Sequence, residues 1–272
     1  MTPLIPMTPK SRSSRQKAPM TAMLFRLLIT GTTAGTLALG VLAGATTAHA
    51  FTPETRFTLA ILDVHESVRE RQAGVERLAV EVRKRTSVQA EPAVAFVPLE
   101  AGELFRFPFV VLPVCRELPP LSDEDTRLLR RYLDVGGLLL IDNCQGRPDG
   151  AAANWINDQI QRLYPRRTLA PLPSEHSIFR AFYLLDRAYG RTMATSDVMS
   201  ITDGGRTLII LQPNDMFGAL MHDAFGNPIF QVTPRHREMT RRQGVNLVLY
   251  ALTMDYKEDQ IHIPFILQRR RP

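Results

Sequence analysis

Apolar and polar positions alternate along residues 57–252 in a pattern typical of strands and helices that follow one another. Short runs that are almost wholly apolar predict strands covered on both faces, and apolar residues three or four positions apart predict amphipathic helices. The predicted strands are Phe57–Leu62, Ala93–Leu99, Phe109–Cys115, Leu138–Ile141 and Arg206–Gln212. The predicted helices are Glu66–Arg85, one from Ser122 to the residue before Gly136, Trp155–Leu163 and Glu238–Leu252. This alternation predicts one α/β domain with a mostly parallel sheet.

One of these helices carries local signals at both ends. Ser122 is a good N-cap, and Asp125 three positions later completes a capping pattern with acidic residues in the first turn. Gly136 and Gly137 follow its last apolar position, where glycine readily takes the left-handed cap. Residues 164–205 instead hold several Pro and Gly, so we expect an irregular insertion or an active-site loop there.

The N-terminus has the pattern of an export signal. Residues 1–26 are basic and polar, residues 27–47 are apolar or small, and Ala48-His49-Ala50 has the small-x-small pattern of a signal-peptidase site. We therefore expect a signal peptide over residues 1–50 that is cleaved after Ala50. The mature protein is then one domain over residues 51–272, exported to the periplasm or the cell exterior. The alternative is an uncleaved membrane anchor over residues 27–47, and either Met20 or Met23 could be the true start.

Charge and motifs exclude several classes of function. Five of the 33 Lys and Arg, and no acidic residue, lie in the first 50 positions, so the other 222 residues carry 28 basic and 27 acidic side chains, a net of +1. A nearly neutral body argues against nucleic acid as its partner. The sequence holds no GxGxxG and no P-loop, which argues against a nucleotide. It also holds no HExxH or CxxC spacing, which argues against a metal site. We expect no cofactor.

Polar residues follow several of the predicted strands. Ligands of open parallel sheets bind beyond the carboxyl ends of the strands, so we expect these side chains to converge. The candidates are Asp63 and His65 after the first strand, Cys115 after the third, Asp142, Asn143 and Cys144 after the fourth, and Asn214 and Asp215 after the last.

The two cysteines are open to three interpretations. An even cysteine count in an exported chain favours a disulfide, and adjacent strands about 4.8 Å apart would allow one between Cys115 and Cys144. They could equally be inert thiols. One of them could also be a nucleophile with His176 as its base, together with Asp142. Neither cysteine stands in a Gly-x-Cys-x-Gly elbow.

His176 lies between a Pro-rich loop and an apolar Ile-Phe pair. Such a His can act as a base or bind a metal. It can also close a loop by hydrogen bonds, which is the interpretation we favour.

Several stretches resemble a bacterial family, the domain of unknown function 4159, whose members are similar to the class I glutamine amidotransferase-like superfamily. The matching stretches are Phe105–Phe109, Leu121–Glu124, Tyr132–Asp142, Glu175–Phe179, Gly244–Thr253 and Tyr256–Pro264. The resemblance implies a flavodoxin-like three-layer domain. It supplies no reaction. Many members of the family look to have a second acidic residue at the position where this chain has Asn143. Without that second carboxylate beside Asp142, a metal site or an acid–base site there is less well supported.

These observations favour an exported, non-catalytic amidotransferase-like domain that binds a small ligand or a protein partner in the cell envelope. On this interpretation the chain meets the membrane only during export, unless the signal is uncleaved. One alternative is a cysteine-dependent hydrolase or transferase that uses Cys144 or Cys115 with His176. Another is a carbohydrate-related or metal-assisted role for Asp63, Asp142, His176 and Asp215. Residues 256–264 are either a tail that closes the sheet edge or a strap that docks a partner.

Overall fold

The computed structural model describes residues 56–269, with side chains up to Met254. The chain divides into two units, Met1–Phe51 and Thr52–Pro272, and all the described residues belong to the second. The signal peptide, its cleavage after Ala50 and the alternative anchor over residues 27–47 lie outside the described residues and stay predictions. Of the helices within residues 56–269, none has both the length and the apolar character that crossing a membrane requires.

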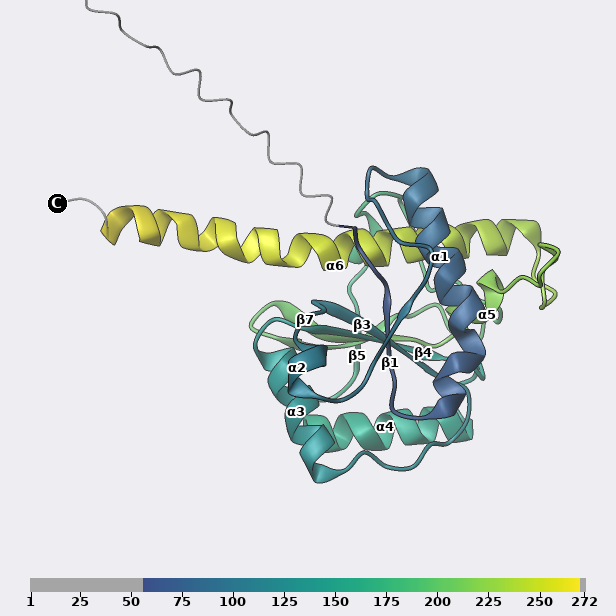
Figure 1. Ribbon diagram of the computed structural model, residues 1–272, viewed down its shortest axis with the longest axis horizontal. Coiled ribbons are helices and arrows are strands. Elements are labelled where there is room, and N and C mark those ends of the chain that lie inside the picture. Colours follow the sequence, from purple (N-terminus) through teal and green to yellow (C-terminus); the bar gives the residue numbers. More distant parts are fainter. Residues whose placement is uncertain (1–55, 270–272) are drawn as a thin grey trace, which may run out of the picture. The chain divides into compact units, whose positions relative to one another are not determined.

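The described residues form a sheet of seven strands in the order β2-β1-β3-β4-β7-β6-β5 (Figure 1). The strands are β1 (Ala60–Leu62), β2 (Ala95–Val97), β3 (Phe109–Val114), β4 (Leu138–Asn143), β5 (Ala170–Pro171), β6 (Met199–Asp203) and β7 (Arg206–Gln212). β2, β1, β3, β4 and β7 pair in parallel, whereas β6 and β5 extend the sheet in antiparallel pairs. The predicted α/β fold with a mostly parallel sheet is confirmed.

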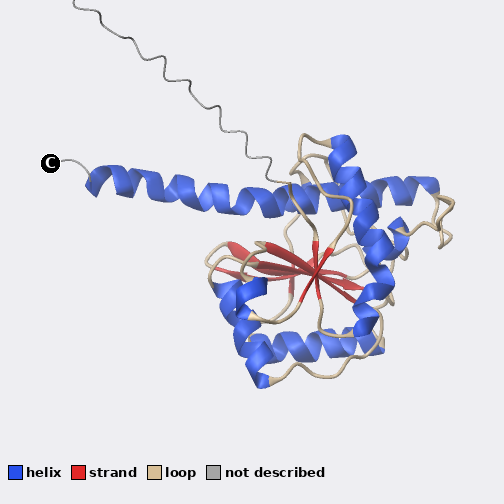
Figure 2. Cartoon of the chain, in the orientation of Figure 1, coloured by secondary structure: helices blue, strands red, loops and turns tan. Residues whose placement is uncertain are grey.

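Helices lie on both sides of this sheet (Figure 2). The α-helices are α1 (Gln72–Arg85), α2 (Ala101–Leu104), α3 (Asp123–Asp134), α4 (Ala151–Leu163), α5 (Met216–Leu220) and α6 (Pro234–Arg269), and the 3-10 helices are η1 (Glu66–Arg71) and η2 (Ser177–Phe179). α1, α5 and α6 pack on one another on one side, and α3 packs on α4 on the other (Figure 1). α1 lies so close to α5 that a methyl group at Gly74 would overlap the carbonyl group of Phe217.

The centre of the sheet is the most deeply buried part of the domain. Every residue of β3 and β4 is buried, as expected for strands covered on both faces. The two strands pair in register over six residues, from Phe109 opposite Leu138 to Val114 opposite Asn143. Since both strands end at the same level, the residues that follow them, Cys115 and Cys144, come out side by side.

The end signals of α3 are confirmed. The Ser122 hydroxyl accepts a hydrogen bond from the Asp125 amide at 3.0 Å, and the Asp125 carboxylate accepts one from the Ser122 amide at 3.3 Å. This capping box satisfies amides that the first helical turn leaves without a partner. α3 then ends at Asp134, and Gly136 takes a positive φ of 130°.

The structure differs from the prediction in its short helices and strands, and where a helix continues beyond the apolar pattern that predicted it. The predicted helix over residues 66–85 begins with the 3-10 turns of η1, a common start for an α-helix. The segment 164–205 is not wholly irregular, since it contains β5, η2 and β6. The last helix runs from Pro234 to Arg269 instead of Glu238–Leu252, so residues 256–264 continue α6 as helix. Their side chains lie outside the described ones, and the role of that run stays a prediction.

Candidate functional site

Two buried aspartates at the carboxyl edge of the sheet bind the first turn of α5. Asp142, near the end of β4, accepts hydrogen bonds from the amides of Met216 and Phe217, both at 2.8 Å. Asp215 is the N-cap of α5 and accepts one from the Gly218 amide at 3.0 Å. Both aspartates are fully buried. Together they satisfy amides of the helix start that would otherwise lack partners.

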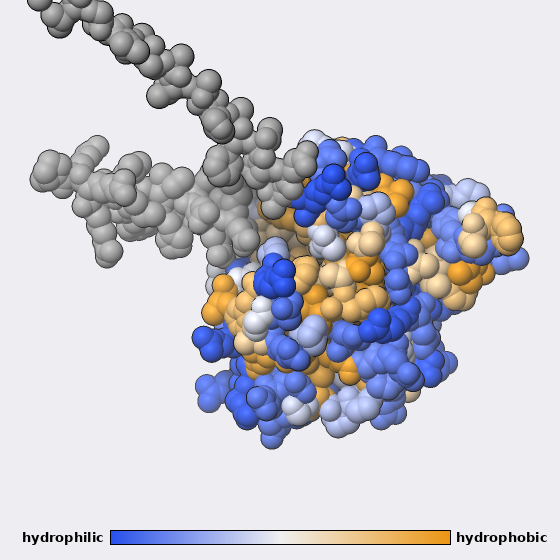
Figure 3. All heavy atoms as spheres, in the orientation of Figure 1, coloured by the Kyte–Doolittle hydropathy of each residue, from blue (hydrophilic) through white to orange (hydrophobic). Residues whose placement is uncertain are grey.

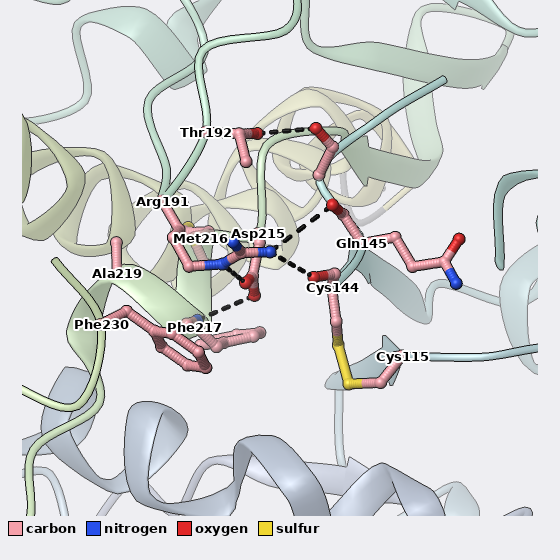
Figure 4. Close-up of polar contacts among 12 residues, drawn as sticks. Cys115, Cys144, Gln145, Arg191, Thr192, Asp215, Met216, Phe217, Ala219 and Phe230 are labelled. Atoms are coloured by element: carbon pink, nitrogen blue, oxygen red, sulfur yellow. Dashed lines mark hydrogen bonds and ion pairs between the residues drawn. A yellow bond between two sulfur atoms is a disulfide. The ribbon is translucent and has the colours of Figure 1, made fainter. Parts of the chain in front are cut away.

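Asp215 is also held by two arginines. Arg71, the last residue of η1, donates to its two carboxylate oxygens from Nε at 2.9 Å and from Nη2 at 3.1 Å. Arg191, in the loop before β6, donates to the same carboxylate from its own Nε (Figure 4). The backbone of Asp215 has a φ of 55°, a left-handed conformation that is uncommon outside glycine. These contacts offset the strain of that conformation.

The same arginines contact the end of β4. Nη2 of Arg191 donates to the carbonyl oxygen of Cys144 at 3.0 Å, and Nη2 of Arg71 donates to it at 3.5 Å (Figure 4 shows the Arg191 bond). Their guanidinium groups also lie against the ring of Phe230, with centroid distances of 5.2 Å for Arg71 and 5.1 Å for Arg191. We call Arg71, Asp142, Arg191 and Asp215 the carboxyl-edge cluster.

Burial changes the acidity of this cluster. Burial, together with the charge of Asp215, raises the pKa of Asp142 to about 7, while the amides of Phe217 and Met216 oppose the shift. Two carboxylates and two guanidinium groups balance when both acids are ionised. The cluster becomes more positive by one charge when Asp142 is protonated.

Cys115 and Cys144 form a disulfide, with their Cα atoms 4.4 Å apart and 29 positions between them in sequence. Of the three interpretations of the cysteines, the structure therefore has the bridge. Cys144 is buried. Since both sulfur atoms are used, neither cysteine is a thiolate in this oxidised form, and the nucleophile interpretation would require the bridge to be reduced.

The other strand-end candidates have local partners of their own. Asp63 forms a partly exposed ion pair with Arg69 at 2.6 Å. Nδ1 of His65 accepts from the Ser67 amide at 3.2 Å and caps η1.

The two asparagines each close a loop. Nδ2 of Asn143 donates to the Arg147 carbonyl at 2.8 Å, which closes the turn after β4. Nδ2 of Asn214 donates to the carbonyl of Thr195 at 2.8 Å and to that of Ala188 at 3.2 Å, and so holds the loop that carries Arg191.

The structure does not bring His176 to the cysteines. Nδ1 of His176 accepts from the Ile178 amide at 3.3 Å and caps η2, while Nε2 lies 3.2 Å from the hydroxyl of Thr207. Thr207 is the second residue of β7, and Gln212, at the other end, lies five residue steps or about 17 Å further along the strand. His176 therefore lies at the amino edge of the sheet, opposite the carboxyl-edge cluster.

Arg71, Arg191 and Phe230 were not among the sequence candidates. Arg71 had a signal, because it stands among Val68, Val75 and Leu78 at helical spacing, and a charge on a buried stripe needs a partner. Arg191 and Phe230 lie in loops without periodicity and far from Arg71 in the chain. No sequence signal joins them to it.

A cavity of about 500 Å³ lies next to Phe230. Its walls combine apolar and polar side chains: Pro228, Phe230, Gln231, Val232, Thr233 and Arg237. Gln231 and Thr233 are exposed, so the cavity opens to solvent, whereas Arg237 is buried. None of the sequence candidates is among these walls. Within the described part of the chain, no group of three or more His, Cys, Asp or Glu is placed to hold a metal ion.

Comparison with protein families gives a match. The family model of the domain of unknown function DUF4159 matches residues 58–252, which include all seven strands of the described sheet. A search of the curated proteins found no match.

The disulfide is expected to stabilise the domain by about 3–4 kcal/mol, because it closes a long loop in the unfolded chain. Urea denaturation with and without reductant measures this difference. The control is the double variant Cys115→Ser/Cys144→Ser, which should have the stability of the reduced protein and no response to reductant. A wild-type protein whose midpoint ignores the reductant would contradict the prediction.

The raised pKa of Asp142 predicts a pH dependence of stability. Between pH 3.8, the ordinary value for Asp, and about 7, the folded protein keeps a proton that the unfolded chain has released. The contribution of Asp142 to the free energy of unfolding should therefore be largest below that window and fall as the pH rises through it. Asp142→Asn should remove this fall, and it should cost about 1–2 kcal/mol at acidic pH because the new amide faces a backbone N–H.

Urea denaturation at a series of pH values measures both curves. The matched control is Asp149→Asn, an exposed aspartate in the loop after β4. Its curve should run parallel to that of the wild type. If the Asp142→Asn curve is also parallel to the wild type, the raised pKa is wrong.

Proposed function

This chain belongs to the DUF4159 family, and from that premise we propose that it is an exported, non-catalytic domain that binds a ligand or a protein partner in the cell envelope. We propose further that its fold is a flavodoxin-like three-layer domain of the class I glutamine amidotransferase-like superfamily. The order of the parallel strands, β2-β1-β3-β4-β7, supports this placement, since flavodoxin-like sheets have their first five strands in the order 2-1-3-4-5.

The reactive groups at the carboxyl edge are already bonded within the protein, and this supports the non-catalytic part of the proposal. A glutaminase of that superfamily needs a free cysteine in a glycine-flanked elbow after a strand. Here β3 ends in Pro113-Val114 and is followed by Cys115-Arg116, and the sulfur of Cys115 is bonded to Cys144. Both acids of the cluster already accept hydrogen bonds from protein donors. A general base needs a lone pair that can reach a substrate proton, and this arrangement turns the lone pairs inward.

The cavity beside Phe230 supports a binding role. Its volume of about 500 Å³ is within the range of small-molecule sites, about 300–1,000 Å³. Phe230 stacks on Arg71 and Arg191, so the rigid carboxyl-edge cluster fixes one wall. Gln231 and Thr233 offer hydrogen-bonding groups at an open rim. Such a site suits a ligand or peptide segment with an apolar portion and polar ends.

The exported protein should have the intact mass of a chain that begins at Phe51, less two hydrogens for the disulfide.

That protein should release no product from L-glutamine, a nitrophenyl ester or a nitrophenyl glycoside faster than buffer alone. The expectation holds before and after reduction, because opening the bridge leaves the cysteines without His176. Activity that appears on reduction and is lost in Cys144→Ala would replace this proposal with the cysteine-dependent enzyme.

Binding can be tested by site-specific photocrosslinking in the cell envelope. Benzoylphenylalanine at Gln231, on the rim of the cavity, should give a discrete crosslinked product. The matched control places it at Glu124, which is equally exposed but lies on α3, on the other side of the sheet. Equal products at both positions, or none at Gln231, would contradict a binding site at this cavity.

A further inference from the structure

The loop between α5 and α6, residues 221–233, carries large apolar side chains in solvent. Phe225 is 91% exposed and Ile229 is 48% exposed. In the surface view, an apolar area covers this loop where it protrudes at the right edge of the molecule (Figure 3). A contiguous apolar area on an exposed protrusion is a feature of interaction sites.

The tip of this loop is built to hold its shape. The carboxylate of Asp223 accepts hydrogen bonds from the amides of Phe225 at 2.9 Å and Asn227 at 2.8 Å. The Asp223 amide donates to the Asn227 carbonyl at 2.8 Å, and Gly226 supplies the positive φ of 83° that the turn needs. Phe225 is therefore held outward by the turn itself.

Arg237 fixes the base of the loop to α6. Its buried guanidinium group donates to the carbonyl oxygens of Ala219, at the end of α5, and of Phe230, the latter at 2.9 Å. A third bond reaches the Val232 carbonyl at 3.4 Å. The segments before and after the tip are therefore both tied to one side chain.

Positive charge is concentrated on the two helices next to this loop. Residues 72–85 of α1 and 234–242 of α6 hold eight Lys and Arg against three acidic residues, a net of +5, whereas residues 51–272 as a whole have a net of +1. The two segments adjoin, since Arg85 pairs with Glu238 at 2.8 Å. We call the exposed and half-buried residues within 72–85 and 234–242 the basic surface.

The loop and the basic surface are continuous. Burial lowers the pKa of His222, at the start of the loop, and the charges of Arg77, Arg237 and Arg241 lower it further. Arg77 and Arg241 belong to the basic surface, and Arg237 is the buried residue that holds the base of the loop. An apolar tip and a positive field therefore occupy the same region of the domain.

We propose that the α5–α6 loop and the basic surface dock this domain on an anionic lipid bilayer. Phe225 and Ile229 would enter the interface between headgroups and acyl chains, and the basic surface would attract the headgroups, in the manner of peripheral membrane proteins. A protein partner is the weaker fit, because a protein interface needs about 800 Å² from each side, and a narrow turn offers two apolar side chains. The proposal does not depend on the absence of catalysis or on a ligand in the cavity.

From the sequence we expect contact with the membrane only during export, unless the signal is uncleaved. The folded surface adds a contact that the mature domain itself would make. That contact uses residues 221–242 and 72–85, none of which belongs to the predicted signal or anchor.

Vesicle cosedimentation of the full protein tests the docking. Wild-type protein should bind phosphatidylcholine vesicles that contain phosphatidylglycerol and should bind pure phosphatidylcholine much less. Phe225→Ser should weaken binding about tenfold, because it removes the apolar group that enters the bilayer. Its control is Val135→Ser, another exposed apolar residue, at the end of α3, where we expect less than a twofold change.

A matched pair of charge reversals tests the basic surface. Arg83→Glu/Lys84→Glu on α1 should weaken binding at least tenfold, and Arg127→Glu/Arg131→Glu on α3 should change it less than threefold, although both pairs alter net charge equally and all four residues are exposed. All variants share the same N-terminus, so their differences report on the domain alone. Unchanged melting temperatures show that each variant is folded.

Three results would overturn the proposal. The first is equal binding to neutral and anionic vesicles, or to neither. The second is wild-type binding by the Phe225→Ser variant. The third is tighter binding to soluble polyglutamate than to vesicles, without dependence on Phe225, which would make an acidic protein the partner of the basic surface instead.

Discussion

The carboxylate of Asp215 is the contact on which the carboxyl edge of the sheet depends. It is fully buried, yet it joins η1 through Arg71, the loop before β6 through Arg191, and the first turn of α5 through Gly218. Ion pairs taken out of water stabilise a fold only when their remaining hydrogen-bonding groups are satisfied. Here the spare donors of both arginines reach the Cys144 carbonyl, and the ring of Phe230 covers both guanidinium groups. If this carboxylate were removed, two cations at the edge would lose their counter-charge.

The disulfide and the carboxyl-edge cluster act as one unit. The bridge fixes the ends of β3 and β4 relative to each other, and the backbone of Cys144 passes that position to Arg71 and Arg191. Phe230 rests on these arginines, and Arg237 binds the Phe230 carbonyl from α6. A continuous series of contacts thus runs from the centre of the sheet to the α5–α6 loop. In these contacts the two acids accept hydrogen bonds from protein donors, and both sulfur atoms are used in the disulfide.

The central strands were predictable because burial on both faces of the sheet requires a nearly continuous run of apolar residues, as in β3, β4 and β7. The short elements were not. α5 has five residues, too few to show a period, and only Met199 and Ile201 mark β6 as apolar. The Gly204-Gly205 pair between β6 and β7, with φ values of 57° and 90°, is a hairpin signal that the composition of the segment concealed.

At the site, the strand-end rule located Asp142, Asp215 and both cysteines. It could not supply Arg191 or Phe230, whose positions depend on long-range packing, and it gave no means of placing His176 at the opposite edge.

The charge of this chain shows why a total can mislead. A net charge of +1 over residues 51–272 indicates a neutral body. Within that body, however, residues 72–85 and 234–242 have a net charge of +5, so the other residues together have a net charge of −4. The separation follows from packing, since α1 and α6 lie against each other, and in the described ion pairs Glu81 and Glu238 are shared among several arginines of the two helices. An excess of cations on one side raises the electrostatic cost of folding unless a partner offsets it. The exposed apolar loop adjoins this same excess. An anionic bilayer, in which apolar acyl chains lie beneath charged headgroups, would lower the free energy of both features at once.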